Sequence, residues 1–209
     1  MNREIIRILV VVFAFGTIFN AKAQVTILGS AGANISRLNN SSADSRFGYQ
    51  LGGYIDYALP KSWSVYSGLL LTTKGTKNYE GNDDSSVNAI YLEVPVMCAY
   101  NINLSKSTNL RISLGPYFAV GIGGNTRITR FYKVESGQRT ERRNYNTFAD
   151  DVLKTFDYGA DIRIGIETRA YLISFASQFG IPNISGGAFD RSARNQNYSI
   201  TFAYKFYSK

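Results

Sequence analysis

Residues 156–167, FDYGADIRIGIE, alternate between polar and apolar side chains with a period of two. The charged residues share one parity: Asp157, Asp161, Arg163 and Glu167. Most of the other positions are aromatic or aliphatic: Phe156, Tyr158, Ala160, Ile162, Ile164 and Ile166. Because successive side chains of a β-strand point to opposite faces, the pattern predicts a strand with one charged face and one apolar face.

The same alternation recurs along the chain and predicts eight strands in all. They cover residues 25–34, 48–59, 63–74, 89–100, 110–122, 156–167, 171–181 and 197–207. Their lengths are close to the roughly 9 to 11 residues that a tilted strand needs to cross a bilayer. After residue 24 no segment has the roughly eighteen consecutive apolar residues of a membrane-spanning helix, so a helical membrane protein is excluded.

Alternation alone does not say which face lies inside a closed sheet. A soluble periplasmic ligand-binding barrel would enclose the apolar face, whereas a membrane barrel turns that face toward lipid. Two features favour the membrane barrel. Short connections alternate with long ones, as periplasmic turns and external loops do in outer-membrane barrels: 60–62, 102–109 and 168–170 are short, and 35–47, 75–88, 123–155 and 182–196 are long. The bulky apolar set would also overpack an eight-stranded interior.

We therefore predict an all-β fold, an eight-stranded antiparallel up-and-down transmembrane β-barrel with short periplasmic turns and longer external loops. A charged side chain facing lipid costs about 1 to 4 kcal/mol, so the charged parity should line the lumen. There we expect a structural polar network of Asp56, Lys74, Glu93, Arg111, Asp157, Asp161, Arg163, Glu167 and Lys205. The soluble ligand-binding barrel is the alternative.

Aromatic and proline residues refine this prediction. Aromatic rings favour the headgroup level of a bilayer, and four lie near predicted strand ends, where we expect a periplasmic girdle: Tyr57, Trp63, Tyr100 and Phe206. Pro95 and Pro116 fall inside predicted strands, although a closed barrel has no edge strand for a residue without an N–H group. We expect a local β-bulge at each proline.

The N-terminus has the layout of a secretory signal peptide. Arg3 and Arg7 precede an apolar run over residues 8–19, and Ala21-Lys22-Ala23 forms an A-x-A cleavage site. We expect residues 1–23 to be removed and residues 24–209 to form the outer-membrane barrel domain. The formal net charge of +8 favours anionic lipid headgroups or polysaccharide as partners, and nucleic acid is not expected outside the cytoplasm.

The chain contains no histidine, which excludes Ser-His-Asp and Cys-His arrangements and HExxH metal sites. Glu93 with Asp161 could in principle perform acid–base chemistry, but a lumenal salt-bridge network is the favoured interpretation of this pair. We expect no enzyme activity, no cofactor and no metal site. The single cysteine, Cys98, excludes an intramolecular disulfide.

The long connection over residues 123–155 is rich in arginine, and its segment ITRFYKVE alternates enough to extend a hairpin beyond the membrane. Its candidate polyanion-binding residues are Arg127, Arg130, Arg139, Arg142 and Arg143. Their guanidinium groups could bind lipopolysaccharide phosphates or another surface polyanion. The alternative is a solvated connection that only shields the top of the barrel.

Five stretches resemble the PorT-like outer-membrane β-barrel proteins. They are YSGLLLTTKG (66–75), YLEVPVMCAYNI (91–102), LGPYFAVGIGG (114–124), FGIPNIS (179–185) and a final strand ending in YKF. The chain departs from the family at Ser67-Gly68, where relatives often carry proline and glutamate, and in the three residues that follow Phe206. The resemblance implies an eight-stranded barrel in the outer membrane of a Gram-negative bacterium, and the founding member is linked to protein secretion.

These observations predict an integral outer-membrane barrel with a structural, surface-interaction or secretion-accessory role through its external loops. An eight-stranded lumen is packed with side chains, so we do not expect a general pore. The expected partners are outer-membrane lipid and lipopolysaccharide, with a surface polyanion or a protein as a further partner. We expect a monomer.

Overall fold

A computed structural model describes residues 24–39, 43–80, 83–134, 137–150, 152–186 and 192–208. The predicted signal peptide, residues 1–23, lies outside this range. Within it the chain forms nine β-strands: β1 (Val25–Leu38), β2 (Ala43–Ala58), β3 (Trp63–Glu80), β4 (Asp83–Ser105), β5 (Thr108–Val134), β6 (Gly137–Asn146), β7 (Phe156–Thr168), β8 (Tyr171–Gly180) and β9 (Asn195–Ser208). No helix among these residues is long and apolar enough to cross a membrane.

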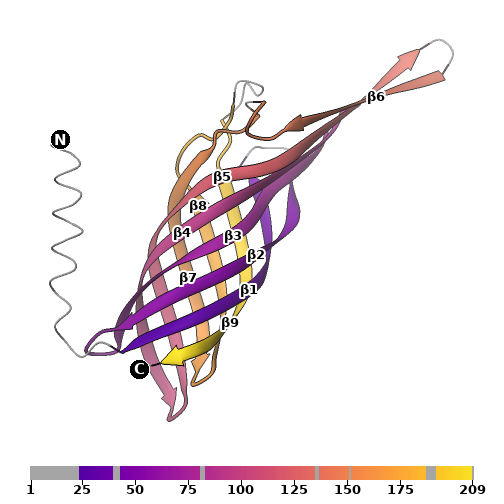
Figure 1. Ribbon diagram of the computed structural model, residues 1–209. Coiled ribbons are helices and arrows are strands. Elements are labelled where there is room, and N and C mark those ends of the chain that lie inside the picture. Colours follow the sequence, from indigo (N-terminus) through magenta and orange to yellow (C-terminus); the bar gives the residue numbers. More distant parts are fainter. Residues whose placement is uncertain are drawn as a thin grey trace, which may run out of the picture.

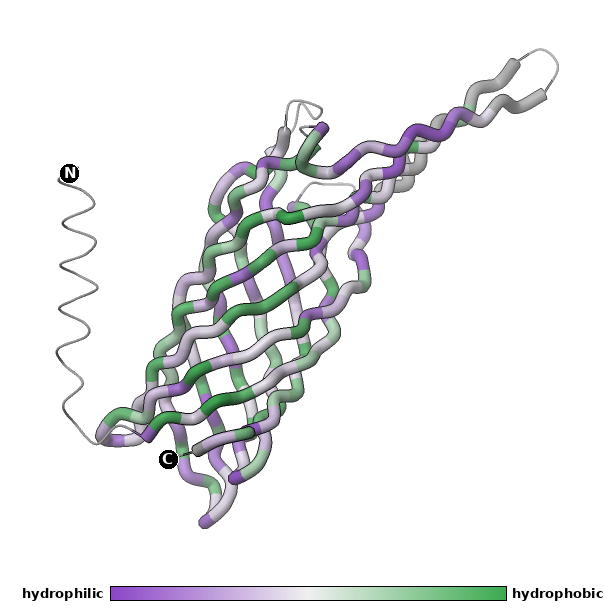
Figure 2. Tube along the Cα trace, in the orientation of Figure 1, coloured by the Kyte–Doolittle hydropathy of each residue, from purple (hydrophilic) through white to green (hydrophobic). Residues whose placement is uncertain are grey.

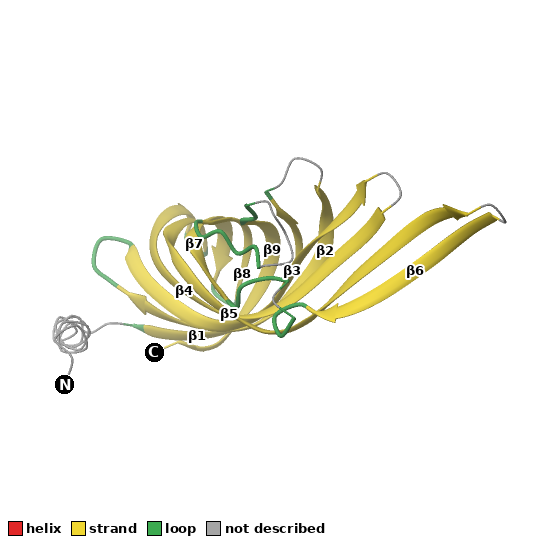
Figure 3. Cartoon of the chain, turned by 90° about the horizontal axis from the view of Figure 1, so that it is seen from above, coloured by secondary structure: helices red, strands yellow, loops and turns green. Residues whose placement is uncertain are grey.

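Eight of the strands close into a barrel (Figures 1 and 3). Neighbouring strands run antiparallel from β1 through β2, β3, β4 and β5 to β7, β8 and β9, and β9 pairs with β1 to complete the circle. Strand β6 stands apart, because it pairs with the distal part of β5 in a hairpin that projects away from the barrel (Figure 1). The predicted eight-stranded up-and-down barrel is confirmed.

The apolar face of the barrel points outward, as predicted. Ile162, Ile164 and Ile166 are 41 to 48% exposed, whereas Asp161 is 0% exposed and Arg163 only 4%. Figure 2 shows hydrophobic and hydrophilic positions interspersed along the barrel strands, and mostly hydrophilic positions along the coloured part of the projecting hairpin. A soluble barrel would leave this large continuous apolar surface in water, so the periplasmic ligand-binding alternative is not supported.

Several strands run farther than predicted at the end opposite the chain termini. β3 continues to Glu80, β4 begins at Asp83 and β5 reaches Val134, so the expected loops 35–47 and 75–88 are mostly strand. At the other end, the expected connection 102–109 shrinks to a turn at residues 106–107. The predicted bounds of these connections were therefore too wide, because ladder hydrogen bonds continue beyond the segments where apolar and polar residues alternate.

The prediction of β-bulges at Pro95 and Pro116 was also wrong. Register shifts in the β4–β5 pair lie at Ile90/Tyr91 and Asn103/Ser105. On one side, Pro95 of β4 pairs with Tyr117 of β5. On the other side, the pairing of β4 with β3 is interrupted between the Ser67–Val96 pair and the Leu70–Glu93 pair. A strand residue directs its N–H to only one neighbour, so each proline removes hydrogen bonds on one side without inserting a residue.

Aromatic rings gather at the end of the barrel that carries the short turns. Trp63 packs against Tyr100 with ring centroids 4.9 Å apart, and Phe206 packs against Tyr204 at 5.2 Å. Tyr57, Trp63, Tyr100 and Phe206 are all exposed on the outer wall, at 38 to 70% of their surface. This arrangement suits rings that lie at a membrane interface.

Candidate functional site

The lumen is filled by charged side chains from several strands. Near the short-turn end, Arg111 of β5 contacts Asp56 of β2 at 2.6 Å and Glu167 of β7 at 3.1 Å. Lys205 of β9 contacts the same Glu167 at 2.6 Å, and Arg111 stacks over the ring of Tyr66. Because each charge has an opposite partner on another strand, this cluster ties β2, β5, β7 and β9 together across the barrel.

A second cluster lies deeper in the lumen around Arg163. Its Nη2 atom lies 2.6 Å from Asp161 Oδ2, and its Nη1 atom donates to the Tyr54 hydroxyl at 2.6 Å. Gln178 donates from one amide nitrogen to Asp161 at 2.9 Å and to Glu93 at 2.6 Å. The amide therefore bridges the two carboxylates that sequence analysis considered as an acid–base pair.

Lys74 is the centre of a third cluster. Its Nζ atom lies 2.8 Å from Glu93 and 3.9 Å from Asp157, and it sits over the ring of Tyr117. Asp157 also accepts hydrogen bonds from the Tyr117 hydroxyl at 3.1 Å and from the Asn195 amide at 2.9 Å. The nine predicted network residues are thus brought together in three linked groups, with five carboxylates facing four cations.

The uncharged members of the network were not predicted from the sequence. Tyr54, Tyr66 and Tyr117 are almost fully buried, as is Gln178, and each hydrogen bonds inside the lumen. Their signal was available in the alternation, because Tyr54 shares its parity with Asp56, Tyr117 with Arg111, and Gln178 with Ser174. Tyrosine and glutamine were overlooked because they are common on either face of a strand.

An apolar cluster covers the lumen at the end opposite the short turns. Val152, Leu153 and Ile184 come from the segments that follow β6 and β8, and they are 0 to 2% exposed. They pack with Tyr91 and with other buried residues: Leu38, Val87, Ala89, Tyr117, Ala119 and Ala193. A bridge between Leu153 and Ser185 joins the two segments, so they form a fixed lid over the barrel.

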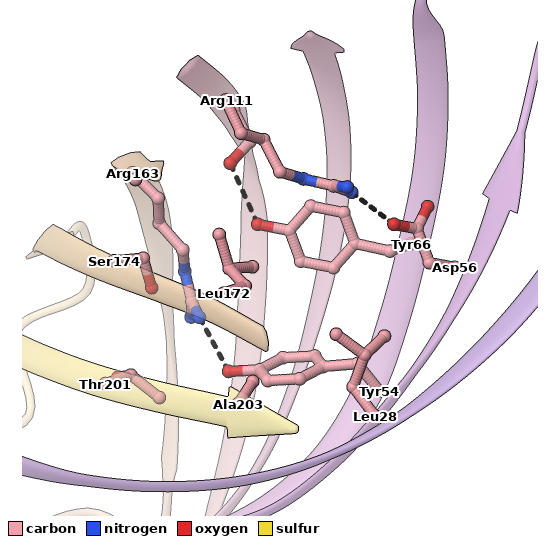
Figure 4. A pocket seen from close by; sticks show the side chains of 12 residues that line it. Leu28, Tyr54, Asp56, Tyr66, Arg111, Arg163, Leu172, Ser174, Thr201 and Ala203 are labelled. Carbon is pink, nitrogen blue, oxygen red and sulfur yellow. Dashed lines mark hydrogen bonds and ion pairs between the residues drawn. The ribbon is translucent and has the colours of Figure 1, made fainter. Parts of the chain in front are cut away.

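The space left inside is small. Figure 4 shows a cavity between Tyr54, Tyr66, Arg111 and Arg163, with a volume of about 20 Å³. That volume holds about one water molecule and excludes an organic ligand. Among the described residues, no group of three or more His, Cys, Asp or Glu could hold a metal ion.

The projecting hairpin presents its arginines on both faces. In the β5–β6 ladder Arg143 lies opposite Ile128, and Arg142 lies opposite Thr129, one step along and therefore on the other face. Arg127 pairs with Asn144 and is exposed. For the remaining two predicted arginines the structure gives only the backbone, with Arg130 opposite Glu141 and Arg139 opposite Tyr132; their side chains lie outside the described part.

One arginine of the hairpin has a local acidic partner. Arg143 Nη2 lies 2.7 Å from Glu141 Oε1, and both side chains are exposed. Hydrogen bonding to Glu141 raises the pKa of Arg143 above its usual value, with a smaller contribution from Tyr145. The contact with Glu141 therefore favours the charged form of Arg143.

Family membership follows from the sequence together with this fold. Residues 12–186 match the family model described as outer membrane protein beta-barrel domain. The chain belongs to this family. The match covers most of the barrel, which makes the protein an outer-membrane β-barrel protein. No curated protein sequence matches the chain.

Solved structures resemble the barrel at low sequence identity. OprG from Pseudomonas aeruginosa is 15% identical, with 89% of this chain and 97% of that chain covered and a TM-score of 0.47. Neisserial surface protein A is 12% identical, with coverages of 86% and 97% and a TM-score of 0.45. Ail from Yersinia pestis is 14% identical, with coverages of 88% and 99% and a TM-score of 0.43. All three TM-scores lie below 0.5.

Proposed function

We propose that this outer-membrane barrel is a closed, non-catalytic platform that presents the basic β5–β6 hairpin to polyanions at the cell surface. One observation carries the proposal: β5 is 27 residues long and continues with β6 well beyond the barrel, with arginines on both faces of the hairpin. A barrel needs only about 9 to 11 residues per strand to cross the membrane. The extra length serves the external side.

The packed lumen supports the non-catalytic part of the proposal. Glu93 and Asp161 are 1% and 0% exposed and are committed to Lys74, Arg163 and Gln178. A carboxylate in acid–base catalysis must reach a substrate proton, whereas among the described residues the lid and the charge clusters enclose both of these side chains. The same filling argues against a general diffusion pore.

The hairpin supports the binding part. Guanidinium groups bind phosphate and sulfate oxygens through two parallel hydrogen bonds, and an exposed ladder holds several of them at fixed spacing. Of the described arginine side chains on the hairpin, Arg127 and Arg142 are exposed and have no carboxylate partner among the described residues. These charges remain available to a polyanion.

The test uses the triple variant Arg139→Ser, Arg142→Ser and Arg143→Ser in refolded, detergent-purified protein. We expect its affinity for heparin, a soluble sulfated polysaccharide, to fall at least about tenfold at low salt, and the salt dependence to become shallower because fewer ionic contacts remain. Surface plasmon resonance over a range of sodium chloride concentrations measures both quantities.

A control removes the same charge at the opposite end of the barrel. Lys61, Lys106 and Arg169 lie in or beside the short turns and are exposed, so their triple serine variant should bind heparin as the unchanged protein does. An equal loss in both triple variants would show that net charge acts alone, and it would overturn the role of the hairpin.

We further propose that the chain belongs to the PorT-like group within its family. The two most specific resembling stretches, YLEVPVMCAYNI and LGPYFAVGIGG, lie in β4 and β5, which pair directly with each other. A secretion-accessory role would require a protein partner at the hairpin. A photocrosslinking residue in place of exposed Asn144 would capture such a partner in intact cells.

A further inference from the structure

A polar depression interrupts the outer wall of the barrel near the base of the hairpin. Its volume is about 260 Å³, and it is lined by Arg46, Ser86, Asn88, Asn125 and Arg127. The lining comes from β2, β4 and β5. Of these residues only Arg127 belongs to the basic set of the hairpin, and none takes part in the lumenal network.

The depression lies directly above the apolar band. On β4, Leu92 and Val94 point outward with 37 to 38% of their surface exposed, and Asn88 and Ser86 continue the same parity. On β5, outward-facing Ile122 is 56% exposed, and Asn125 and Arg127 follow it. Since Asn88 pairs with Asn125 and Ser86 with Arg127, the change from apolar to polar occurs at one level on both strands. That level marks the outer boundary of the hydrocarbon and the start of the headgroup region.

The lining offers hydrogen-bond donors to an anion. Arg46 Nη1 donates to Ser86 Oγ at 3.0 Å, which holds this guanidinium over β4, and a guanidinium carries five N–H donors in all. The Asn88 and Asn125 amides add further donors. Within the described part of the chain neither Arg46 nor Arg127 forms an ion pair with a carboxylate, and exposed Lys77 lies opposite Ser86 on β3. The nearest described acidic residue in this row is Asp44, opposite Lys77 on β2.

The backbone beside the depression is fixed. Gly124 has a φ of +151°, and a Cβ there would collide with the carbonyl oxygen of Asn88. The same carbonyl accepts a hydrogen bond from the Thr147 hydroxyl at 2.7 Å. Position 124 therefore requires glycine, and the close approach of β4 and β5 sets Asn88 and Asn125 side by side before any ligand arrives.

We propose that this depression binds the phosphate of a glycolipid in the outer leaflet, with Arg46 and Arg127 as its principal ligands. The apolar strip below it, formed by Ile90, Leu92 and Ile122, would contact the acyl chains of the same molecule. A soluble polyanion would use the arginines without this strip, and the direct continuity of both surfaces favours a lipid. The inference rests on the outer-membrane placement of the barrel and names a lipid ligand apart from the soluble polyanions proposed for the hairpin.

The test measures lipid retention by native mass spectrometry of the detergent-solubilised barrel. The probes are bisphosphorylated lipid A and the same lipid A with both phosphates removed. We expect the unchanged protein to bind the phosphorylated form at least about tenfold more tightly, and the double variant Arg46→Gln and Arg127→Gln to lose that preference while it still migrates as a folded, heat-modifiable barrel. Equal binding of the two lipids by the unchanged protein would overturn the proposal.

A matched control removes two arginines from the same end on another side of the barrel. Arg37 and Arg194 are exposed near the ends of β1 and β9, so the variant Arg37→Gln and Arg194→Gln should keep the preference within about twofold. If this control loses the preference for phosphorylated lipid A to the same extent, the preference depends on net charge alone and the proposed site is contradicted. Displacement of lipid A by millimolar inorganic phosphate would assign the depression to free phosphate and overturn the lipid assignment.

The design separates this inference from the proposed function. The single variant Arg46→Gln leaves every arginine of the hairpin in place, including Arg127, so its heparin binding should change by less than about threefold while its preference for phosphorylated lipid A falls. A variant that loses its preference for phosphorylated lipid A and still binds heparin supports the proposed lipid site in the depression on the outer wall. Retained selectivity in the double variant contradicts that site, whatever the hairpin variant does with heparin.

Discussion

At the scale of single residues, the interior of the barrel depends on charges whose partners are already in place. Arg163 is 4% exposed and contacts Asp161 and Tyr54. Removing one member of a buried pair leaves an uncompensated charge, whereas replacing both members with apolar groups of similar volume can be nearly neutral. The two kinds of change therefore distinguish a structural network from loosely held lumenal charges.

We expect Arg163→Met to destabilise the folded barrel by about 3 to 5 kcal/mol, because Asp161 would keep its charge without its partner. The double variant Arg163→Met and Asp161→Leu should recover most of that loss. Urea unfolding in lipid vesicles, followed by the fluorescence of the single tryptophan, Trp63, gives both free energies. Ile164→Met on the outer wall is the control and should change stability by less than about 1.5 kcal/mol. Equal stability of Arg163→Met and the control would contradict a paired interior.

At the scale of the strands, alternation predicted the membrane-spanning segments and, beyond them, only the extension of β5 into the projecting hairpin. All eight barrel strands were found in the sequence because lipid outside and charge inside impose opposite demands on successive positions. Beyond the hydrocarbon both faces of a strand meet water. The alternation of apolar and polar residues is therefore weaker in β6 and in the distal parts of β3 and β4. The depression around Arg46 and Arg127 was missed for a related reason, since it depends on the register that joins β4 to β5.

The interrupted ladder at Pro95 leads to a prediction for a strand. In Pro95→Ala the new N–H group can donate to β3 beside Gly68, which should add about 0.5 to 1.5 kcal/mol of stability. A proline-to-alanine change also increases the entropy of the unfolded chain, which lowers the stability of the folded protein. Pro182 lies outside the strands, so Pro182→Ala measures this loss of stability without a new ladder hydrogen bond. We expect Pro95→Ala to be the more stable of the two in urea unfolding. If Pro95→Ala is no more stable than Pro182→Ala, the new N–H group has formed no hydrogen bond to β3, and the prediction is contradicted.

At the scale of the whole molecule, the barrel is an inverted globular protein, with its charges enclosed and its apolar side chains outside. The sequence alone supported this orientation through the size of an eight-stranded interior and through Asp157, Asp161, Arg163 and Glu167 on one parity. The lid could not be foreseen, because Val152, Leu153 and Ile184 come from segments with no periodic pattern. Their packing requires a closed barrel to receive them.

The native cysteine provides the most direct test of this orientation. Cys98 is exposed on the outer wall and lies on the same parity as Val94 and Val96. A nitroxide attached to Cys98 in protein reconstituted into lipid vesicles should collide readily with oxygen, which dissolves in hydrocarbon, and rarely with a water-soluble nickel chelate. A label at Asn144→Cys in a Cys98→Ala background should show the reverse, because the hairpin lies in water. Frequent collision of the Cys98 label with the nickel chelate would place the apolar wall in water and contradict the account.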